Sequence, residues 1–180
     1  MEAFRQLEEE ARGLSLLYVD DETDIREEMA RLLGRYYSAV ETAGNGMEGL
    51  KHYELNRHDI VITDIRMPEM DGVEMTQKIR SLDPNQVVVV ISAYDFSDRL
   101  APFLKRGVDG FLLKPVNHHN LVETLIAASR KARNKQQGIV EHVGGEGADP
   151  ERIRKLEERV HNLEGTVARL REMVERLSGV

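Results

Sequence analysis

The sequence predicts an α/β fold: a doubly wound, five-stranded parallel sheet followed by a long coiled-coil helix. Two observations predict the sheet. Short apolar runs alternate with amphipathic helical stretches five times over residues 14–133, and most of these runs end on polar residues. Helical crossovers between apolar strands imply a parallel sheet covered on both faces, and right-handed crossovers restrict it to a doubly wound arrangement. A third observation, a heptad pattern near the C-terminus, predicts the long helix.

Composition narrows the class of protein. The chain has 180 residues, 41% of them hydrophobic, which is enough for one ordinary domain and an appendage. Its net charge of −7 argues against direct nucleic-acid binding, and the absence of cysteine excludes disulfides and thiolate metal sites. The charged N-terminus does not resemble a secretory signal, and the longest apolar run, residues 87–91, is too short to cross a bilayer. We expect a cytoplasmic protein with no membrane partner.

The elements follow one another in a regular order. Residues 1–13 predict a short helix, interpreted as a leader segment, because apolar residues recur there at helical spacing and Gly13 ends it. The strands are predicted at residues 14–19, 38–42, 60–62, 87–91 and 110–113. Helices are predicted between and after them, around residues 25–33, 47–55, 73–82, 97–106 and 121–133. Thr23 or Asp24 is expected to cap the helix that follows the first strand.

Four of the five strands end on residues that do different chemical work: Asp20 and Asp21, Asp64, Ser92 and Lys114. In a parallel sheet these ends lie on one edge, where open α/β sheets bind their ligands. A lone Asp64 would more often cap the loop that follows it. Three crowded carboxylates need a cation, however, and all-oxygen ligation favours Mg²⁺. A lysine and a serine opposite the cation would suit a phosphoryl group, so the joint occurrence favours a functional site.

These residues and their surroundings resemble the receiver domain of bacterial two-component response regulators. The resemblance covers residues 14–133, which we predict to be a flavodoxin-like receiver domain. The matching segments are Leu16-Leu17-Tyr18-Val19-Asp20-Asp21, Asp64 with the following Met67-Pro68 and Met70-Asp71-Gly72, Ser92-Ala93, and Gly110-Phe111-Leu112-Leu113-Lys114-Pro115.

The resemblance implies that Asp64 accepts a phosphoryl group from a histidine kinase or a phosphotransfer protein. Asp21 and Asp64 would bind Mg²⁺ directly, together with the backbone carbonyl of Arg66, and Asp20 would act mainly through water. Such a protein is a phosphoacceptor with Mg²⁺-dependent self-phosphorylation and autodephosphorylation rather than an enzyme.

The resemblance also assigns a switch. Ser92 and Lys114 would contact phosphoryl oxygens, and Phe111 would swing inward when Ser92 moves. The Lys114-Pro115 bond is expected to be cis. Arg66 and Tyr94, each two residues beyond a site residue, are hypothesised to shield the phosphoryl group from water.

The C-terminal part predicts a dimer. Residues 134–149 contain four glycines and are predicted to form a flexible linker. Residues 150–178 are predicted to form a parallel dimeric coiled coil, because β-branched residues and leucines recur every seven positions, offset by three. These residues are Ile153, Val160, Val167 and Val174, and Leu156, Leu163, Leu170 and Leu177. The alternative is an amphipathic helix that packs on its own receiver.

The sequence therefore predicts a response regulator that signals through altered geometry of a receiver homodimer. Two alternatives remain: a constitutive coiled-coil scaffold, and a fragment of a larger regulator whose output domain is absent. An aspartyl-phosphate hydrolase is disfavoured, because such phosphatases usually carry a second acid two residues after the nucleophile, where this chain has Arg66.

Overall fold

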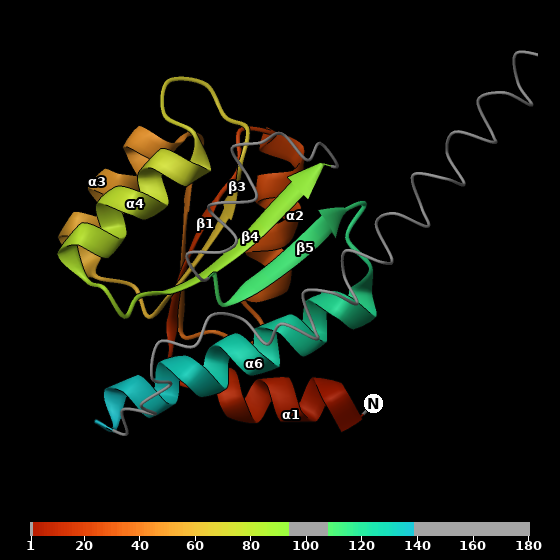
Figure 1. The fold of residues 1–180 in the computed structure, drawn as a ribbon. Coiled ribbons are helices and arrows are strands. Elements are labelled where there is room, and N and C mark those ends of the chain that lie inside the picture. The colour runs from red at the N-terminus through yellow and green to blue at the C-terminus, as the bar shows by residue number, and fades with distance from the viewer. Residues whose placement is uncertain (1, 94–107, 139–180) are drawn as a thin grey trace, which may run out of the picture. The chain divides into compact units, whose positions relative to one another are not determined.

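The sheet has five parallel strands, as predicted, and their order is β2-β1-β3-β4-β5. The computed structural model describes residues 2–93 and 108–138 (Figure 1). Its elements are α1 (Glu2–Ala11), β1 (Ser15–Val19), α2 (Thr23–Leu33), β2 (Ala39–Ala43), α3 (Gly46–Asn56), β3 (Ile60–Asp64), α4 (Gly72–Leu82), β4 (Val87–Ala93), β5 (Gly110–Lys114) and α6 (His118–Gln136). The predicted helix at 97–106, Tyr94, residues 139–149 of the predicted linker and the predicted coiled coil lie outside the described residues.

Strand β3 lies at the centre of the sheet, between β1 and β4. All five of its residues are buried, and so are the first six residues of β4. Short runs of this kind, rich in valine and isoleucine, are typical of strands that are covered on both faces. The register pairs Val19 with Thr63, and Asp64 with Ile91, so the carboxyl ends of β1, β3 and β4 lie together at one edge.

Helices cover both faces of the sheet and enclose two apolar cores. On one face, α1, α2 and α6 pack over side chains that include Leu16, Tyr18 and Ile62. On the other face, α3 and α4 pack over Leu17 and Val61. This alternation along each strand is the period of two that a strand imposes on its side chains. Within the described part of the chain, none of the helices has the length and apolar character of a membrane span.

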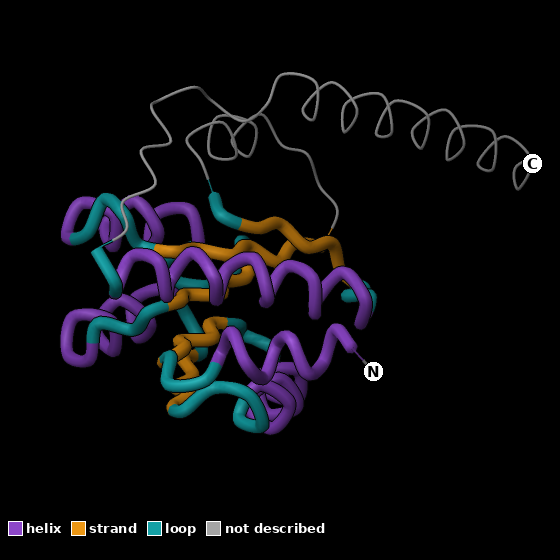
Figure 2. The backbone as a smooth tube through the Cα atoms, turned by 90° about the horizontal axis from the view of Figure 1, so that it is seen from below, coloured by secondary structure: helices purple, strands orange, loops and turns teal. Residues whose placement is uncertain are grey.

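Helix α1 is an integral part of the domain, so its interpretation as a leader segment was wrong. Its Leu7 and Ala11 are buried in the same core as α6, and the two helices lie side by side in both views (Figures 1 and 2). Arg133 Nη2 of α6 donates hydrogen bonds to the backbone carbonyls of Glu9, Glu10 and Arg12. The guanidinium therefore satisfies carbonyls at the end of α1 that have no partner within the helix.

Two helix ends differ from the prediction. Helix α2 is capped neither by Thr23 nor by Asp24: its N-cap is Glu22, whose side chain makes no capping hydrogen bond. That side chain instead reaches Lys114. Helix α6 continues to Gln136, three residues beyond the expected end. The extension is held by Lys135, which pairs with Asp83, and by Gln136, which donates to Asp59.

Candidate functional site

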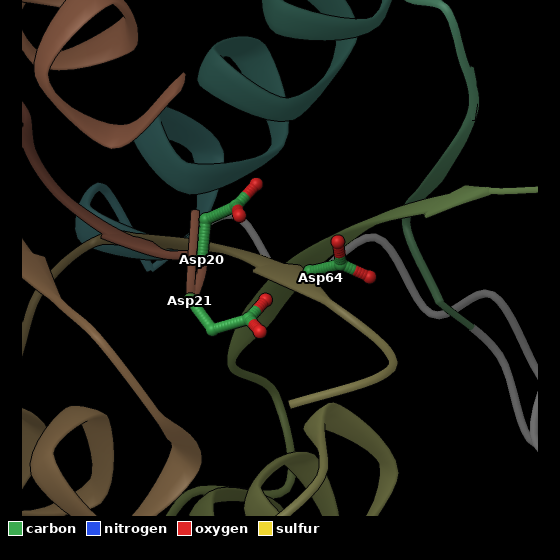
Figure 3. A group of neighbouring side chains, drawn as sticks. All are labelled: Asp20, Asp21 and Asp64. Carbon is green, nitrogen blue, oxygen red and sulfur yellow. The ribbon is translucent and has the colours of Figure 1, made fainter. Parts of the chain in front are cut away.

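Three aspartates meet at the carboxyl edge of the sheet. Asp20 and Asp21 directly follow β1, and Asp64 is the last residue of β3 (Figure 3). One carboxylate oxygen from each lies within 4.8 Å of the other two. Asp20 has no exposed surface and Asp64 is 8% exposed, whereas Asp21 lies at the surface. The cluster is therefore open to solvent on the side of Asp21.

Lys114, at the end of β5, reaches across the edge to this cluster. Its Nζ donates to Asp64 Oδ2 at 2.5 Å, to Asp20 Oδ2 at 3.1 Å and to Glu22 Oε1 at 3.1 Å. Burial by itself lowers the pKa of Lys114, but the hydrogen bonds to Asp64 and Asp20 outweigh it and raise the pKa above its usual value. One permanently charged ammonium thus faces several carboxylates, and the site keeps an excess of negative charge.

Asp64 also organises the loop that follows it. Its Oδ1 accepts hydrogen bonds from the backbone N–H groups of Ile65 and Arg66, at 2.5 and 3.2 Å. The loop-capping role considered for Asp64 is therefore real, but it occupies one oxygen while Oδ2 points to Lys114. The loop returns so closely that a Cβ at Gly72 would lie 2.0 Å from the Asp64 carbonyl oxygen. Only glycine permits this approach.

Asp20 is buried and held by several donors. Its Oδ1 accepts from the Glu22 N–H at 3.0 Å, and its Oδ2 accepts from the Tyr18 hydroxyl at 3.0 Å as well as from Lys114. Arg26 Nη1 donates to the Asp20 carbonyl at 2.7 Å. Burial, together with the charge of Asp20, raises the pKa of Tyr18 far above its ordinary value. Its hydroxyl therefore stays a donor.

Sequence reasoning missed Tyr18, Glu22 and Arg26. A signal for Tyr18 was present, since a residue two positions before Asp20 on a strand points to the same face. Glu22 is the third acid of a consecutive run, but its reach to Lys114 depends on the start of α2. No local pattern indicates that Arg26 folds back onto the Asp20 carbonyl.

The two predicted switch residues lie on neighbouring strands. Ser92 is 5% exposed, and its Oγ donates to the Ala93 carbonyl at 3.1 Å. It follows Ile91, which is paired with Asp64 in the sheet. Phe111 on β5 is partly buried and packs against the core on the α3 and α4 face. The Lys114-Pro115 peptide bond is cis, as expected.

The donor set fits a hard divalent cation. The three aspartates offer only oxygen, and their mutual repulsion exceeds what Lys114 compensates. Mg²⁺ prefers carboxylate oxygens and keeps several waters, which the exposed side at Asp21 permits. The acidic cluster is thus of the kind that binds Mg²⁺ in receiver domains.

A doubly wound parallel sheet of order 2-1-3-4-5, with acidic residues and a lysine at its carboxyl edge, defines a receiver-type signalling module. Residues 16–126 match the model of the response regulator receiver domain family, so the chain belongs to that family. Receiver domains are phosphoacceptor modules of two-component signalling rather than enzymes in the usual sense.

Individual relatives agree with this assignment. Chemotaxis protein CheY of Listeria monocytogenes serovar 1/2a is 34% identical over 118 residues, which are 65% of this chain and 99% of that protein. The CheY-like receiver domain protein of Methanospirillum hungatei JF-1 has a TM-score of 0.63 and 28% identity, covering 68% of this chain and 98% of that one. A chain of the Borrelia burgdorferi CheX-CheY-BeF3-Mg²⁺ complex has a TM-score of 0.58 and 26% identity, covering 63% of this chain and 87% of that chain.

Proposed function

We propose that this protein is a cytoplasmic, phosphorylation-dependent response regulator in which Asp64 accepts a phosphoryl group from a histidine kinase or a phosphotransfer protein. The observation that carries the proposal is the position of the Asp64 carboxylate, which lies beside the other two carboxylates and accepts a hydrogen bond from Lys114 Nζ at Oδ2. In this chain a nucleophilic oxygen and a cationic partner for the transferred oxygens occur together. The Borrelia burgdorferi complex, which holds CheY with BeF3 and Mg²⁺, supports the same chemistry.

The transfer follows from the charges at the site. Asp64 Oδ2 forms a bond to phosphorus while the bond from phosphorus to the donor's imidazole nitrogen breaks, and the imidazole leaves with the electron pair. Lys114 stabilises the charge on the transferring oxygens. Ser92, which now donates to Ala93, would turn its hydroxyl to another phosphoryl oxygen. The product is an acyl phosphate, which water hydrolyses, so the signal limits itself.

The cation would be held by Asp21, Asp64 and the backbone carbonyl of Arg66, with Asp20 acting through water. When bound, Mg²⁺ supplies charge neutralisation that lets a carboxylate approach an anionic phosphoryl group. Asp64 Oδ1 stays fixed by the Ile65 and Arg66 N–H groups, so the side chain is already oriented before the donor arrives. Lys114 has to exchange one carboxylate for a phosphoryl oxygen. The exposed Glu22 holds it least firmly.

We further propose that the C-terminal segment, residues 150–178, joins two receivers through a parallel coiled coil. The support is the heptad pattern of the sequence alone. A tether raises the local concentration of the receivers, so a small phosphorylation-dependent gain in their affinity would change the geometry of the pair. Ser92 and Phe111 would relay the change from Asp64 to the surface. Analytical ultracentrifugation of the full chain tests this arrangement, and we expect a dimer. A monomer at concentrations where coiled coils associate would contradict the proposal.

Phosphorylation is tested directly with acetyl phosphate and Mg²⁺, followed by intact-mass and peptide mass spectrometry. The wild type should gain one phosphoryl group on Asp64, and Asp64→Asn should lose at least about 100-fold of the labelling rate, because the amide is not a nucleophile. Asp59→Asn is the matched control, since Asp59 directly precedes the same strand, at the end away from Asp64. Equal labelling of both variants, or none in the wild type, would refute the assignment and favour a constitutive scaffold.

A further inference from the structure

We propose that Tyr18 is a positioning residue for the cation site: its buried hydroxyl holds the Asp20 carboxylate in the orientation that Mg²⁺ binding requires, independently of Lys114. The proposal rests on the proposed function only in taking Mg²⁺ as the cation. It assigns a role to a side chain that neither binds the cation nor touches the phosphoryl group.

The geometry of Asp20 is the first support. Asp20 has no exposed surface, so bulk water cannot solvate its charge, and a buried carboxylate needs donors for its oxygens. The backbone N–H of Glu22 serves Oδ1, whereas Oδ2 is shared by the Tyr18 hydroxyl and Lys114 Nζ. Both donors lie within 3.1 Å of Oδ2 and together fix the rotation of the carboxylate.

The second support is the divided role of Lys114. Its ammonium group contacts Asp20, Glu22 and Asp64 at once. An ammonium has three donor hydrogens, so any movement of Lys114 toward a phosphoryl oxygen takes a donor from one carboxylate. The Tyr18 hydroxyl is not involved in that exchange. It continues to donate a hydrogen bond to Asp20 Oδ2 when Lys114 moves to another partner.

The third support is the rigidity of Tyr18. The residue lies in β1 between β2 and β3, paired with Thr42 on one side and Ile62 on the other. It is 1% exposed, and its ring is part of the apolar core under α2 and α6. A tyrosine has only two side-chain torsions, and packing fixes both. The hydroxyl is therefore a fixed donor, whereas the longer lysine side chain can move.

Two other buried tyrosines provide matched controls. The Tyr37 hydroxyl lies 2.9 Å from Ser129 Oγ, and the Tyr53 hydroxyl donates to Gln86 Oε1 at 2.9 Å. Neither partner belongs to the acidic cluster. Replacing Tyr37 or Tyr53 by phenylalanine removes one buried hydroxyl and one hydrogen bond, as in Tyr18→Phe, but leaves Asp20 untouched. A difference among the three variants therefore reports the site and not the loss of a buried hydroxyl.

The experiment is isothermal titration of the full chain with Mg²⁺ at constant pH and without a phosphodonor. Partners that orient a direct metal ligand typically contribute 10- to 100-fold to metal affinity; because Asp20 acts through water, Tyr18→Phe should raise the Mg²⁺ dissociation constant by a smaller factor, roughly 5-fold. Tyr37→Phe and Tyr53→Phe should stay within about twofold of the wild type. Melting temperatures without Mg²⁺ show whether each variant is folded.

A double-mutant cycle identifies Asp20 as the route of the effect. If Tyr18 acts by positioning Asp20, Tyr18→Phe should change the Mg²⁺ affinity little in an Asp20→Asn background, so the two effects are not additive. Full additivity, or a Tyr18→Phe affinity equal to that of Tyr37→Phe, would overturn the inference. Since no phosphoryl transfer is measured, a failure to label Asp64 would refute the proposed function and leave this result standing.

Discussion

The two ends of β3 carry aspartates with opposite roles. Asp64 ends the strand and lies beside two other carboxylates. Asp59 directly precedes the strand, and its carboxylate is fully occupied by donors of the chain. Its Oδ2 accepts from Ser15 N and Ser15 Oγ at 2.7 Å, and its Oδ1 accepts from Gln136 Nε2 at 2.7 Å.

The two carboxylates differ in the charges of the groups that surround them. At the amino end, the donors that satisfy Asp59 are neutral, and they join β1, β3 and α6. At the carboxyl end, Lys114 is shared by Asp20, Glu22 and Asp64. A carboxylate that is satisfied by neutral donors stabilises the fold, whereas three carboxylates within 4.8 Å of one another carry an excess of negative charge that a cation can neutralise. The groups around each carboxylate in the folded structure therefore distinguish a structural aspartate from a functional one, and the neighbouring residues in the sequence are not needed for this distinction.

The largest expected effect is a difference in sign between two substitutions. Asp59→Asn should lower the free energy of unfolding by about 1 kcal/mol, because hydrogen bonds to a charged acceptor become neutral ones. Asp64→Asn in Mg²⁺-free buffer should cause no loss and should gain up to about 1 kcal/mol, because one crowded charge disappears while the acceptor for Ile65 N is kept. Urea unfolding measures both. Equal losses in the two variants would break the comparison.

Mg²⁺ sharpens the same contrast. A cation that binds only the folded protein stabilises it by about 1.4 kcal/mol at ten times its dissociation constant. We expect this gain in the wild type and in Asp59→Asn, and its loss in Asp21→Asn and Asp64→Asn. The measurement is the melting temperature of each variant over a series of Mg²⁺ concentrations. The reference is the melting temperature of the same variant in buffer that contains a chelator and no divalent cation. A gain that survives Asp21→Asn would place the cation elsewhere.

The amino end should also show a pH dependence through His58. This side chain is 3% exposed, and its Nε2 lies 3.1 Å from Glu41 Oε2. Burial lowers its pKa below the ordinary 6.5, although Glu41 acts in the opposite direction. The unfolded state therefore binds the proton more readily than the folded state. Above pH 6.5 His58 is neutral in both states and does not change the free energy of unfolding, whereas this free energy decreases as the pH falls below that value.

Urea unfolding between pH 8 and pH 5.5 tests this expectation, with buffers chosen on both sides of the ordinary histidine pKa of about 6.5. His58→Gln, which can still donate to Glu41, should lose less stability over that range than the wild type. The exposed His119, which pairs with Glu123, provides a control: His119→Gln should follow the wild-type curve. Parallel curves for the wild type and His58→Gln would contradict the assignment.

The smallest effect is expected at the end of α6. Lys135 and Asp83 form a partly exposed ion pair, and such pairs contribute about 0–1 kcal/mol. Lys135→Ala should therefore lower the free energy of unfolding by about 0.5 kcal/mol and leave Mg²⁺ affinity and phosphoryl labelling unchanged. A changed labelling rate would show that the amino end of the sheet communicates with Asp64.

Much of the candidate site follows from the order of strands and helices. Asp20, Asp64 and Lys114 could be placed at one edge because each follows an apolar run, and parallel strands bring their carboxyl ends together. Helix ends were predicted less well. The N-cap of α2 is Glu22 rather than Thr23 or Asp24, and its side chain accepts a hydrogen bond from Lys114, which lies 92 positions away. Local preference does not include a partner at that separation.

The sequence by itself determined the alternation of strands and helices, the parallel sheet and the gathering of three aspartates and a lysine, because these depend on periodicity and on strand direction. Only the tertiary structure decided that α1 docks on α6, that Asp59 is satisfied by Ser15 and Gln136, and that Tyr18 supports Asp20. The physical reason is that periodicity shows which face of an element is buried, whereas the partner on that face is set by the packing of segments far apart in the chain.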